Sequence, residues 1–204
     1  MNEYLLDLVE RIRCDDKLKN SDEKTSWKAL REAELLTNID FIEPLKLFIT
    51  QEANKKTRDA AYFILGKIAK NKNCEDVCAF LIFRVDQEKD KYVISSMLDR
   101  IADLNKPVGI DLQPIIKCLQ SKEWLIRQAA IRAFSNCSDP RVEDILIEIL
   151  ENPADNTDLI YANATLNKIG TKKSIPYLEK MLKSRNQDVK GSAKLAIEKI
   201  TERG

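Results

Sequence analysis

The strongest constraint on the fold is a spacing of apolar residues that recurs six times along the chain. Six triplets occupy positions i, i+3 and i+7, which lie on one face of an α-helix. Successive triplets begin 30 to 37 residues apart, and they are Leu5/Leu8/Ile12, Ile42/Leu45/Ile49, Cys78/Leu81/Val85, Leu112/Ile115/Leu119, Val142/Ile145/Ile149 and Ile175/Leu178/Leu182. We expect each triplet to mark a helix, and we name these helices the A-series.

A second pattern, i, i+3, i+4 and i+7, falls between the triplets and marks a B-series of helices. Its copies are Ala29/Glu32/Ala33/Leu36, Ala61/Ile64/Leu65/Ile68, Ile94/Met97/Leu98/Ile101, Ala130/Ala133/Phe134/Cys137, Ala162/Thr165/Leu166/Ile169 and Ala193/Ala196/Ile197/Ile200. Polar segments rich in Asn, Asp, Lys and Pro separate the two series, as turns do. The spacing predicts six helix pairs, in repeats spanning roughly residues 2–37, 38–71, 74–105, 108–137, 139–170 and 172–203.

One helix pair buries too little apolar area to fold alone, so such pairs are expected to stack. The small residues of the B-series allow neighbouring pairs to approach closely. We therefore expect an all-α protein that forms one domain over residues 1–204, a right-handed α–α solenoid of about six antiparallel helix pairs. Glu32 interrupts the apolar pattern of the first pair, which suits a solvent-facing cap.

Three segments give the chain a family resemblance. Thr57-Arg58 precedes Ala60 to Ile68, Leu125-Ile126-Arg127 precedes Ala129 to Phe134, and Asp188-Val189-Lys190 precedes Ser192 to Ile200. In these segments the chain resembles HEAT repeats, including the shorter bacterial HEAT-like repeats related to phycobilisome-lyase-type proteins. The resemblance implies a HEAT-like, ARM-type superhelix. The acidic residue of the family is absent before Arg58 and Arg127, so we expect an incomplete ladder of acid–arginine pairs between repeats.

The chain lacks the residues on which most catalytic and metal sites depend. It contains no histidine, which excludes Ser–His and Cys–His pairs and most zinc sites. Its five glycines are too scattered to form a phosphate-binding loop. We therefore expect no catalytic residues, no metal, no cofactor and no enzymatic activity.

Charge and cysteine content narrow the partners and the compartment. The 34 basic and 33 acidic residues nearly cancel, so nothing favours a polyanionic partner. Cys14, Cys74, Cys78, Cys118 and Cys137 are odd in number and lie in or beside apolar helical patterns, which suits reduced thiols. No signal peptide or membrane-spanning segment is expected. The sequence predicts a cytoplasmic protein and does not determine its oligomeric state.

Two rows of basic residues follow the B-series. Arg58, Lys91, Arg127 and Lys190 each precede a B-series signature by three positions, beside the core stripe. We expect this row to bond across repeats or to helix ends. Lys67, Arg100, Lys168 and Lys199 form a second row on the other side of each helix. The rows do not merge, which argues against a continuous nucleic-acid patch.

The B-series helices also carry aromatic and polar residues that point away from the core stripe. B-series helices usually line the concave side of such solenoids, and aromatic and Arg side chains are enriched in protein interfaces. The predicted partner-binding residues are Tyr62, Phe63, Tyr92, Ser95, Asp99, Gln128, Ile131, Arg132 and Ile160. The alternative is that the B-series helices are sandwiched between neighbours and bury a second stripe.

The sequence favours a non-catalytic scaffold or adaptor that binds a protein or peptide, and an immunity or antitoxin-like regulator would be one case. A second hypothesis comes from similarity in size and build to HEAT-like alkylpurine DNA glycosylases, which hold DNA in a basic groove. Trp124 and Arg127 are the nearest candidates for that chemistry. The near-neutral charge and the presence of only two tryptophans argue against it, and no residue identifies a chromophore site for lyase activity.

Overall fold

The computed structural model describes residues 1–16, 20 and 23–204 and places them in two compact units. The first unit spans Met1–Leu104 and the second Asn105–Gly204. The helices of the first unit are α1 (Glu3–Ile12), α2 (Thr25–Glu34), α3 (Ile42–Gln51), α4 (Lys55–Lys72), α5 (Glu75–Val85) and α6 (Lys91–Ala102), with a 3₁₀ turn η2 (Ile39–Phe41) before α3. Each predicted A-series or B-series segment before residue 104 therefore forms a helix.

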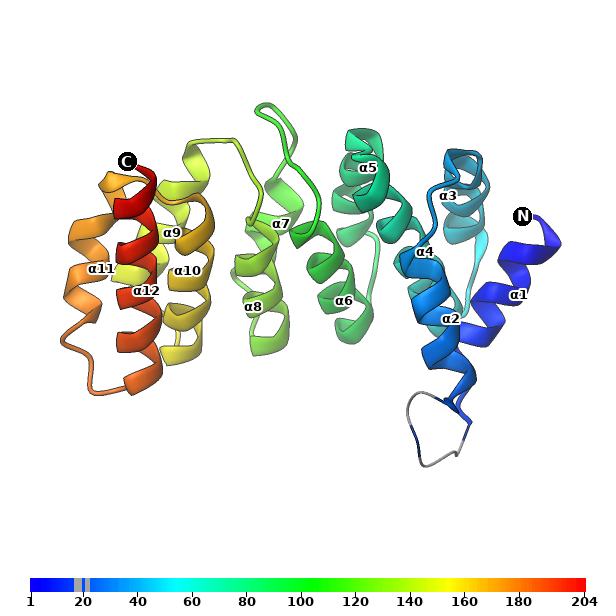
Figure 1. Cartoon of the computed structure of the whole chain (residues 1–204), viewed down its shortest axis with the longest axis horizontal. Coiled ribbons are helices and arrows are strands. Elements are labelled where there is room, and N and C mark those ends of the chain that lie inside the picture. Colours follow the sequence, from blue (N-terminus) through cyan, green and yellow to red (C-terminus); the bar gives the residue numbers. More distant parts are fainter. Residues whose placement is uncertain (17–19, 21–22) are drawn as a thin grey trace. The chain divides into compact units, whose positions relative to one another are not determined.

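In the first unit each A-series helix packs on the B-series helix that follows it. The pairs are α1 with α2, α3 with α4, and α5 with α6. The B-series helices also contact one another in order, because α4 packs against both α2 and α6 (Figure 1). Both series supply the core, whose members include Leu5, Leu8, Leu45, Ile49, Ala61, Ile64, Leu65, Ile68, Leu81, Met97, Leu98 and Ile101.

The second unit repeats this arrangement with three further pairs. Its helices are α7 (Gln113–Cys118), α8 (Trp124–Ala133), α9 (Arg141–Glu151), α10 (Asn156–Ile169), α11 (Ile175–Met181) and α12 (Gln187–Arg203), with a 3₁₀ turn η3 (Lys172–Ser174) before α11. The B-series helix α10 packs between α8 and α12, and α9 contacts α11 (Figure 1). The expected all-α solenoid of antiparallel helix pairs is confirmed in the described residues.

The longer B-series helices begin at residues that satisfy free backbone N–H groups. Asn54, Asp90, Asp155 and Asn186 precede α4, α6, α10 and α12, and each side chain accepts hydrogen bonds from two backbone N–H groups of the first turn. Such caps stabilise a helix start by about 1 kcal/mol each. The polar segments between the two series therefore fix where these B-series helices begin.

The first pair accommodates the charge that interrupts its apolar pattern. Glu32 on α2 accepts hydrogen bonds from the Tyr4 hydroxyl at 2.8 Å and from Arg11 Nη1 at 2.7 Å, both on α1. Burial, together with the Glu32 contact, raises the pKa of Tyr4 to about 12. A polar contact between the two helices thus replaces the apolar contact that the other pairs make.

The fourth pair departs from the predicted pattern because its A-series helix is short. Helix α7 has 6 residues where α9 has 11. Leu119, Ile145 and Ile149, which the spacing assigns to the core, are only partly buried. They line a cavity of about 390 Å³ within the second unit, because α7 is too short to cover this part of α9.

Candidate functional site

The nine residues predicted on an open face of the B-series fall into two groups. Four are buried, and for them the prediction of an exposed face is corrected: Tyr62, Ser95, Gln128 and Ile131. Tyr92 is exposed, and four others are partly exposed: Phe63, Asp99, Arg132 and Ile160. The first unit therefore retains Phe63, Tyr92 and Asp99 as accessible candidates.

Two of the four buried residues form hydrogen bonds with neighbouring helices. The hydroxyl of Tyr62 on α4 accepts a hydrogen bond from Arg84 Nε on α5, 3.1 Å away. In the second unit, the backbone oxygen of Ile131 on α8 accepts a hydrogen bond from Thr165 Oγ1 on α10 at 3.2 Å. Sandwiching of the B-series helices, the alternative that the sequence left open, thus accounts for these positions.

The first basic row bonds as expected at two of its members. Arg58 donates to the backbone oxygens of Glu52 and Ala53 in the turn before its own helix, and to both carboxylate oxygens of Glu88 before the next B-series helix. Its hydrogen bonds to Glu88 raise the pKa of Arg58, which burial alone would lower. The acidic partner that the sequence lacks directly before Arg58 is thus supplied by Glu88 of the following repeat.

Arg127 repeats this arrangement in the second unit. Its guanidinium donates to the backbone oxygens of Ser121 and Lys122, to Asp158 at 3.2 Å and to Asp155 at 2.7 Å. For the other two members of the row, the Lys91 ammonium lies 5.7 Å from the centre of the Tyr92 ring and Lys190 is exposed. The helical spacing placed these arginines correctly but did not identify their acidic partners.

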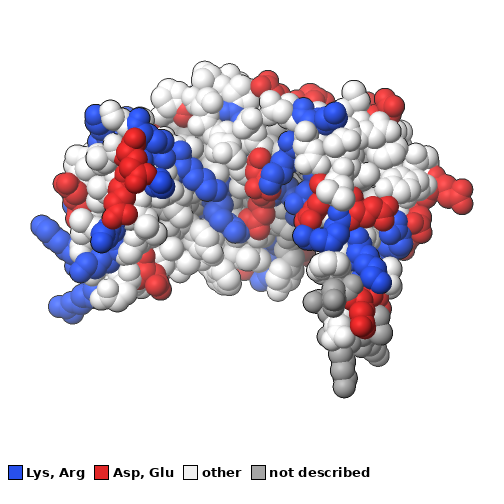
Figure 2. Space-filling model, in the orientation of Figure 1, with Lys and Arg blue, Asp and Glu red and all other residues white. Residues whose placement is uncertain are grey.

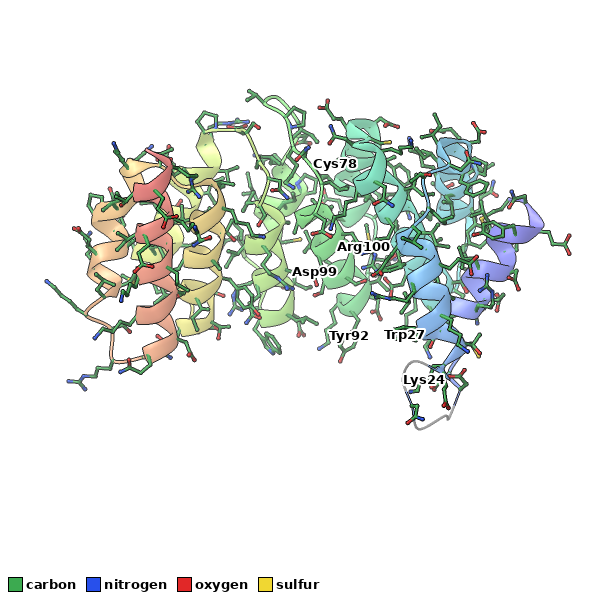
Figure 3. All side chains as sticks on the ribbon, in the orientation of Figure 1. Lys24, Trp27, Cys78, Tyr92, Asp99 and Arg100 are labelled. Carbon is green, nitrogen blue, oxygen red and sulfur yellow. The ribbon has the colours of Figure 1, made fainter. Side chains whose placement is uncertain are left out.

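Three helices of the first unit present polar and aromatic side chains at helical spacing. The stripes are Trp27, Arg31 and Glu34 on α2; Asp59, Phe63, Lys67 and Lys70 on α4; and Tyr92, Ser96, Asp99 and Arg100 on α6, with Asp103 directly after its end. Figure 3 shows Trp27 on α2, with Tyr92 near one end of α6 and Arg100 further along that helix toward α4. We name these three stripes together the first-unit B face.

Contacts between the stripes show that they form one surface. Ser96 Oγ on α6 donates to Asp59 Oδ1 on α4 at 2.5 Å, and Lys70 Nζ lies 2.9 Å from Asp103 Oδ2. On the other side of α4, Lys67 Nζ lies 3.6 Å from Glu34 Oε1 of α2. Acidic and basic side chains are intermixed over this part of the molecule (Figure 2).

Phe63 is the centre of this surface. Its ring centre lies 5.1 Å from the Lys67 ammonium and 5.2 Å from the Arg100 guanidinium, so two cations contact one aromatic ring. On α2, Arg31 lies 5.7 Å from the centre of the Trp27 ring. Such contacts are worth about 0.5–1 kcal/mol each at exposed sites and hold the aromatic side chains in place.

A pocket opens between α4 and α6 beside Phe63. Its volume is about 200 Å³. Gly66 allows the two helices to approach here, because a Cβ at this position would lie 3.2 Å from Arg100 Cβ. We name this space the α4–α6 pocket, and its lining residues are Phe63, Gly66, Lys67, Asp99, Arg100 and Asp103.

Two kinds of feature are absent from the described residues. Among them, no group of three or more His, Cys, Asp or Glu side chains is arranged to hold a metal ion. None of their helices combines the length and the apolar character needed to cross a bilayer. The first-unit B face, which combines accessible aromatic side chains, mixed charge and a pocket, is therefore the candidate functional site.

Comparison with known proteins identifies relatives of the fold. Residues 112–198 match the family of HEAT repeats. The whole fold is similar to that of a designed armadillo repeat protein, with a TM-score of 0.53 and 17% sequence identity over 96% of this chain and 99% of that one. An engineered protein covers 100% of this chain at 18% identity, with a TM-score of 0.48 over 98% of its own length. No curated protein sequence matches the chain.

Proposed function

The chain is a HEAT- or armadillo-like repeat protein, and from this premise we propose that it binds a protein or peptide partner through its first-unit B face, without catalysing a reaction. The repeat fold is compatible with a protein-binding scaffold. Stacked helix pairs offer a surface that no single helix pair could hold in place. The fold alone does not select a face, so the proposal depends on the side chains that this surface presents.

The observation that carries the proposal is the exposure of Tyr92 on α6, the helix that also presents Arg100 to Phe63. The Tyr92 side chain is 66% exposed although it lies on a B-series helix. Tyrosine, tryptophan and arginine are the residues most enriched among those that dominate binding energy at protein interfaces. Trp27 on α2, with Tyr92 and Arg100 on α6, places one of each on the same surface.

The charges of this face favour a protein partner over a nucleic acid. Lysine and arginine are interspersed with Asp59, Asp99 and Asp103, so the surface lacks the continuous positive potential that a phosphate backbone requires. The arginine that the sequence offered for DNA binding, Arg127, is already bonded to Asp155 and Asp158. Protein or peptide binding is therefore the function that this geometry supports best.

The proposal can be tested with a random peptide display library selected on the full chain. The affinities of selected peptides would be measured by fluorescence anisotropy against wild type, Tyr92→Ala and Phe83→Ala. Phe83 is the matched control, because it is 61% exposed on the A-series helix α5 of the same unit. Loss of an interface anchor costs about 2 kcal/mol or more, so we expect binding to weaken more than tenfold in Tyr92→Ala.

Two results would decide against the proposal. Equal affinity for wild type and Tyr92→Ala would show that the face is not used. A stronger effect of Phe83→Ala would move the binding surface to the A-series helices. Circular dichroism of both variants checks that each remains folded, and an exposed side chain on a helix surface is expected to be dispensable for folding.

A further inference from the structure

Three arginines in this chain are buried to the same degree but bonded very differently. The side chains of Arg58, Arg127 and Arg100 are 15%, 12% and 16% exposed. Arg58 and Arg127 each donate to two backbone oxygens and to carboxylates of the following repeat. Their guanidinium groups are therefore well supplied with acceptors and serve to join neighbouring helix pairs.

Arg100 lacks a comparable set of partners among the described residues. Its Nη1 donates to the backbone oxygen of Ser96 on its own helix, and its Nη2 comes no closer than 3.4 Å to Asp59 Oδ1. Its Nε is buried and has no hydrogen-bond partner. A buried donor without an acceptor costs about 1–3 kcal/mol, and more when the group is charged, so such a group calls for an explanation.

The pKa of Arg100 also reflects this shortage of hydrogen-bond acceptors. Burial lowers the pKa of the Arg100 guanidinium, and the nearby carboxylates of Asp59 and Asp99 compensate only in part. For Arg58 the balance is reversed, because its hydrogen bonds to Glu88 outweigh burial and raise its pKa. Burial therefore outweighs the nearby carboxylates at Arg100, whereas the hydrogen bonds to Glu88 outweigh burial at Arg58.

The donors available at the α4–α6 pocket belong to two cations, Arg100 and Lys67. Lys67, on the opposite wall, is 3.6 Å from Glu34, which itself bonds Arg31 at 2.7 Å. Two carboxylates near the pocket are engaged, Asp59 with Ser96 and Asp103 with Lys70. Asp99 also makes an interaction, but its Oδ1 atom is buried without a hydrogen-bond partner. A group that accepts hydrogen bonds and enters the pocket would meet two cations that can donate them.

We propose that the α4–α6 pocket binds the carboxylate of an aspartate or glutamate side chain of the partner, held by Arg100 and Lys67 with its methylene groups against Phe63. This inference rests on the proposed function and names the chemistry of one anchor residue in the partner. Charge-assisted hydrogen bonds to a carboxylate are about twice as strong as neutral ones, which favours a carboxylate over an amide.

The charge of the pocket favours a singly charged anion over a doubly charged one. A volume of about 200 Å³ suits the end of one acidic side chain. Asp59, Asp99 and Asp103 surround the two cations, and like charges within a few ångströms repel. A doubly charged phosphate would meet this repulsion twice over, whereas a carboxylate carries a single charge and can be shared between Arg100 and Lys67.

The experiment uses the full chain labelled with ¹⁵N and two small probes. N-acetyl-glutamate N-methylamide and its glutamine analogue would be titrated to tens of millimolar while the arginine Nε–Hε and backbone amide resonances are recorded. Affinity near 10 mM corresponds to roughly 3 kcal/mol, a reasonable value for one anchored side chain. We expect the glutamate probe alone to shift the Arg100 Nε–Hε resonance and the Gly66 amide in a saturable way.

Variants separate the pocket from general charge effects. Arg100→Gln and Lys67→Gln should each abolish the saturable shift of the Gly66 amide, and the second variant changes a less buried side chain in case the first disturbs folding. Lys168→Gln is the control, because Lys168 belongs to the same basic row but is exposed on α10 in the second unit. Binding in Lys168→Gln should match that of wild type.

Three outcomes would overturn the proposal: equal shifts with the glutamate and glutamine probes, no saturable shift with either, and a larger shift with inorganic phosphate. Failure here is distinguishable from failure of the proposed function. If selected peptides lose affinity in Tyr92→Ala but not in Arg100→Gln or Lys67→Gln, the first-unit B face binds the partner and the acidic anchor is wrong. If the affinity of the selected peptides does not change in Tyr92→Ala, the proposed function itself fails.

Discussion

Arg58 binds Glu88 through two parallel hydrogen bonds, from Nε to Oε2 at 2.9 Å and from Nη2 to Oε1 at 2.8 Å. Because Arg58 lies near the start of α4 and Glu88 in the turn before α6, this pair joins two consecutive repeats. The Glu88 side chain is buried and that of Arg58 is only 15% exposed, so solvent screens their attraction only weakly. The stacking of helix pairs in the first unit thus depends on a polar contact as well as on apolar burial.

Glu88→Gln is expected to lower the free energy of unfolding by about 2–4 kcal/mol, because it leaves the buried guanidinium of Arg58 without a counter-charge. Urea denaturation followed by circular dichroism measures the change. Glu43→Gln is the control: Glu43 pairs with Lys46 at 2.8 Å, but its side chain is 79% exposed. A surface pair of this kind contributes less than about 1 kcal/mol, so equal losses in the two variants would contradict the role assigned to Glu88.

The same pair predicts the response of stability to acid. Burial would raise the pKa of Glu88, but the hydrogen bonds from Arg58 and from the Lys89 N–H hold it below its ordinary value of 4.5. A lowered pKa in the folded state means that the contribution of Glu88 is complete above about pH 5 and is lost as the pH falls through the folded-state pKa. Unfolding free energies measured from pH 6 to pH 3 should fall less steeply in Glu88→Gln than in wild type; parallel curves would be inconsistent with this account.

In the second unit, the buried carboxylate of Glu143 joins two consecutive repeats through hydrogen bonds. Its carboxylate is buried on α9 and accepts hydrogen bonds from the Thr171 N–H at 2.7 Å, from the Thr171 hydroxyl and from Ser174 Oγ at 2.5 Å. Glu143→Gln should therefore destabilise the protein by about 2–3 kcal/mol. Asp144→Asn, one residue along and exposed in its ion pair with Lys173, should change stability by less than about 0.5 kcal/mol. Thermal melts of the two variants provide the comparison, and similar melting temperatures would refute the assignment.

Two helical glycines are predicted to respond oppositely to alanine. Gly191 has no atom within 4 Å of the position of an added Cβ, so Gly191→Ala should stabilise the protein by about 0.5–1 kcal/mol. At Gly66 the added Cβ would lie 3.2 Å from Arg100 Cβ, so α4 and α6 would have to move apart. In Gly66→Ala the steric cost should exceed the benefit of placing alanine in a helix, so we expect the protein to be destabilised by about 1 kcal/mol. Denaturation curves that show equal stabilisation by both changes would indicate that the α4–α6 contact is looser than described.

The helices could be predicted from the sequence because apolar spacing reports directly on which face of a helix is buried. Leu45, Ile49, Ile64 and Ile68 illustrate this, since each was placed in the core by its spacing and is buried. The length of α7 could not be predicted, because where a helix ends depends on the path of the chain before and after it. Its early end leaves Ile145 and Ile149 only partly covered.

The candidate site could be predicted only in part. Tyr62 and Tyr92 were both predicted on the open face of the B-series, yet one is buried and the other exposed. Burial of Tyr62 depends on α5, which supplies Arg84 as the partner of its hydroxyl, and no local pattern reveals that contact. Lys106 shows the same limit, because it falls in a polar loop segment but is buried where the backbone pairs with Asn136 and Ser138.

Hydrogen–deuterium exchange of the full chain, with and without a saturating selected peptide, tests the central claim most directly. Binding to the first-unit B face should slow exchange in α4 and α6, with the largest changes around Phe63, Tyr92 and Arg100, because ordered contacts reduce local opening. The A-series helices α3 and α5 should change little. Protection confined to α3 and α5, with exchange in α4 and α6 unaltered, would contradict the proposal that this face is where the protein binds its partner.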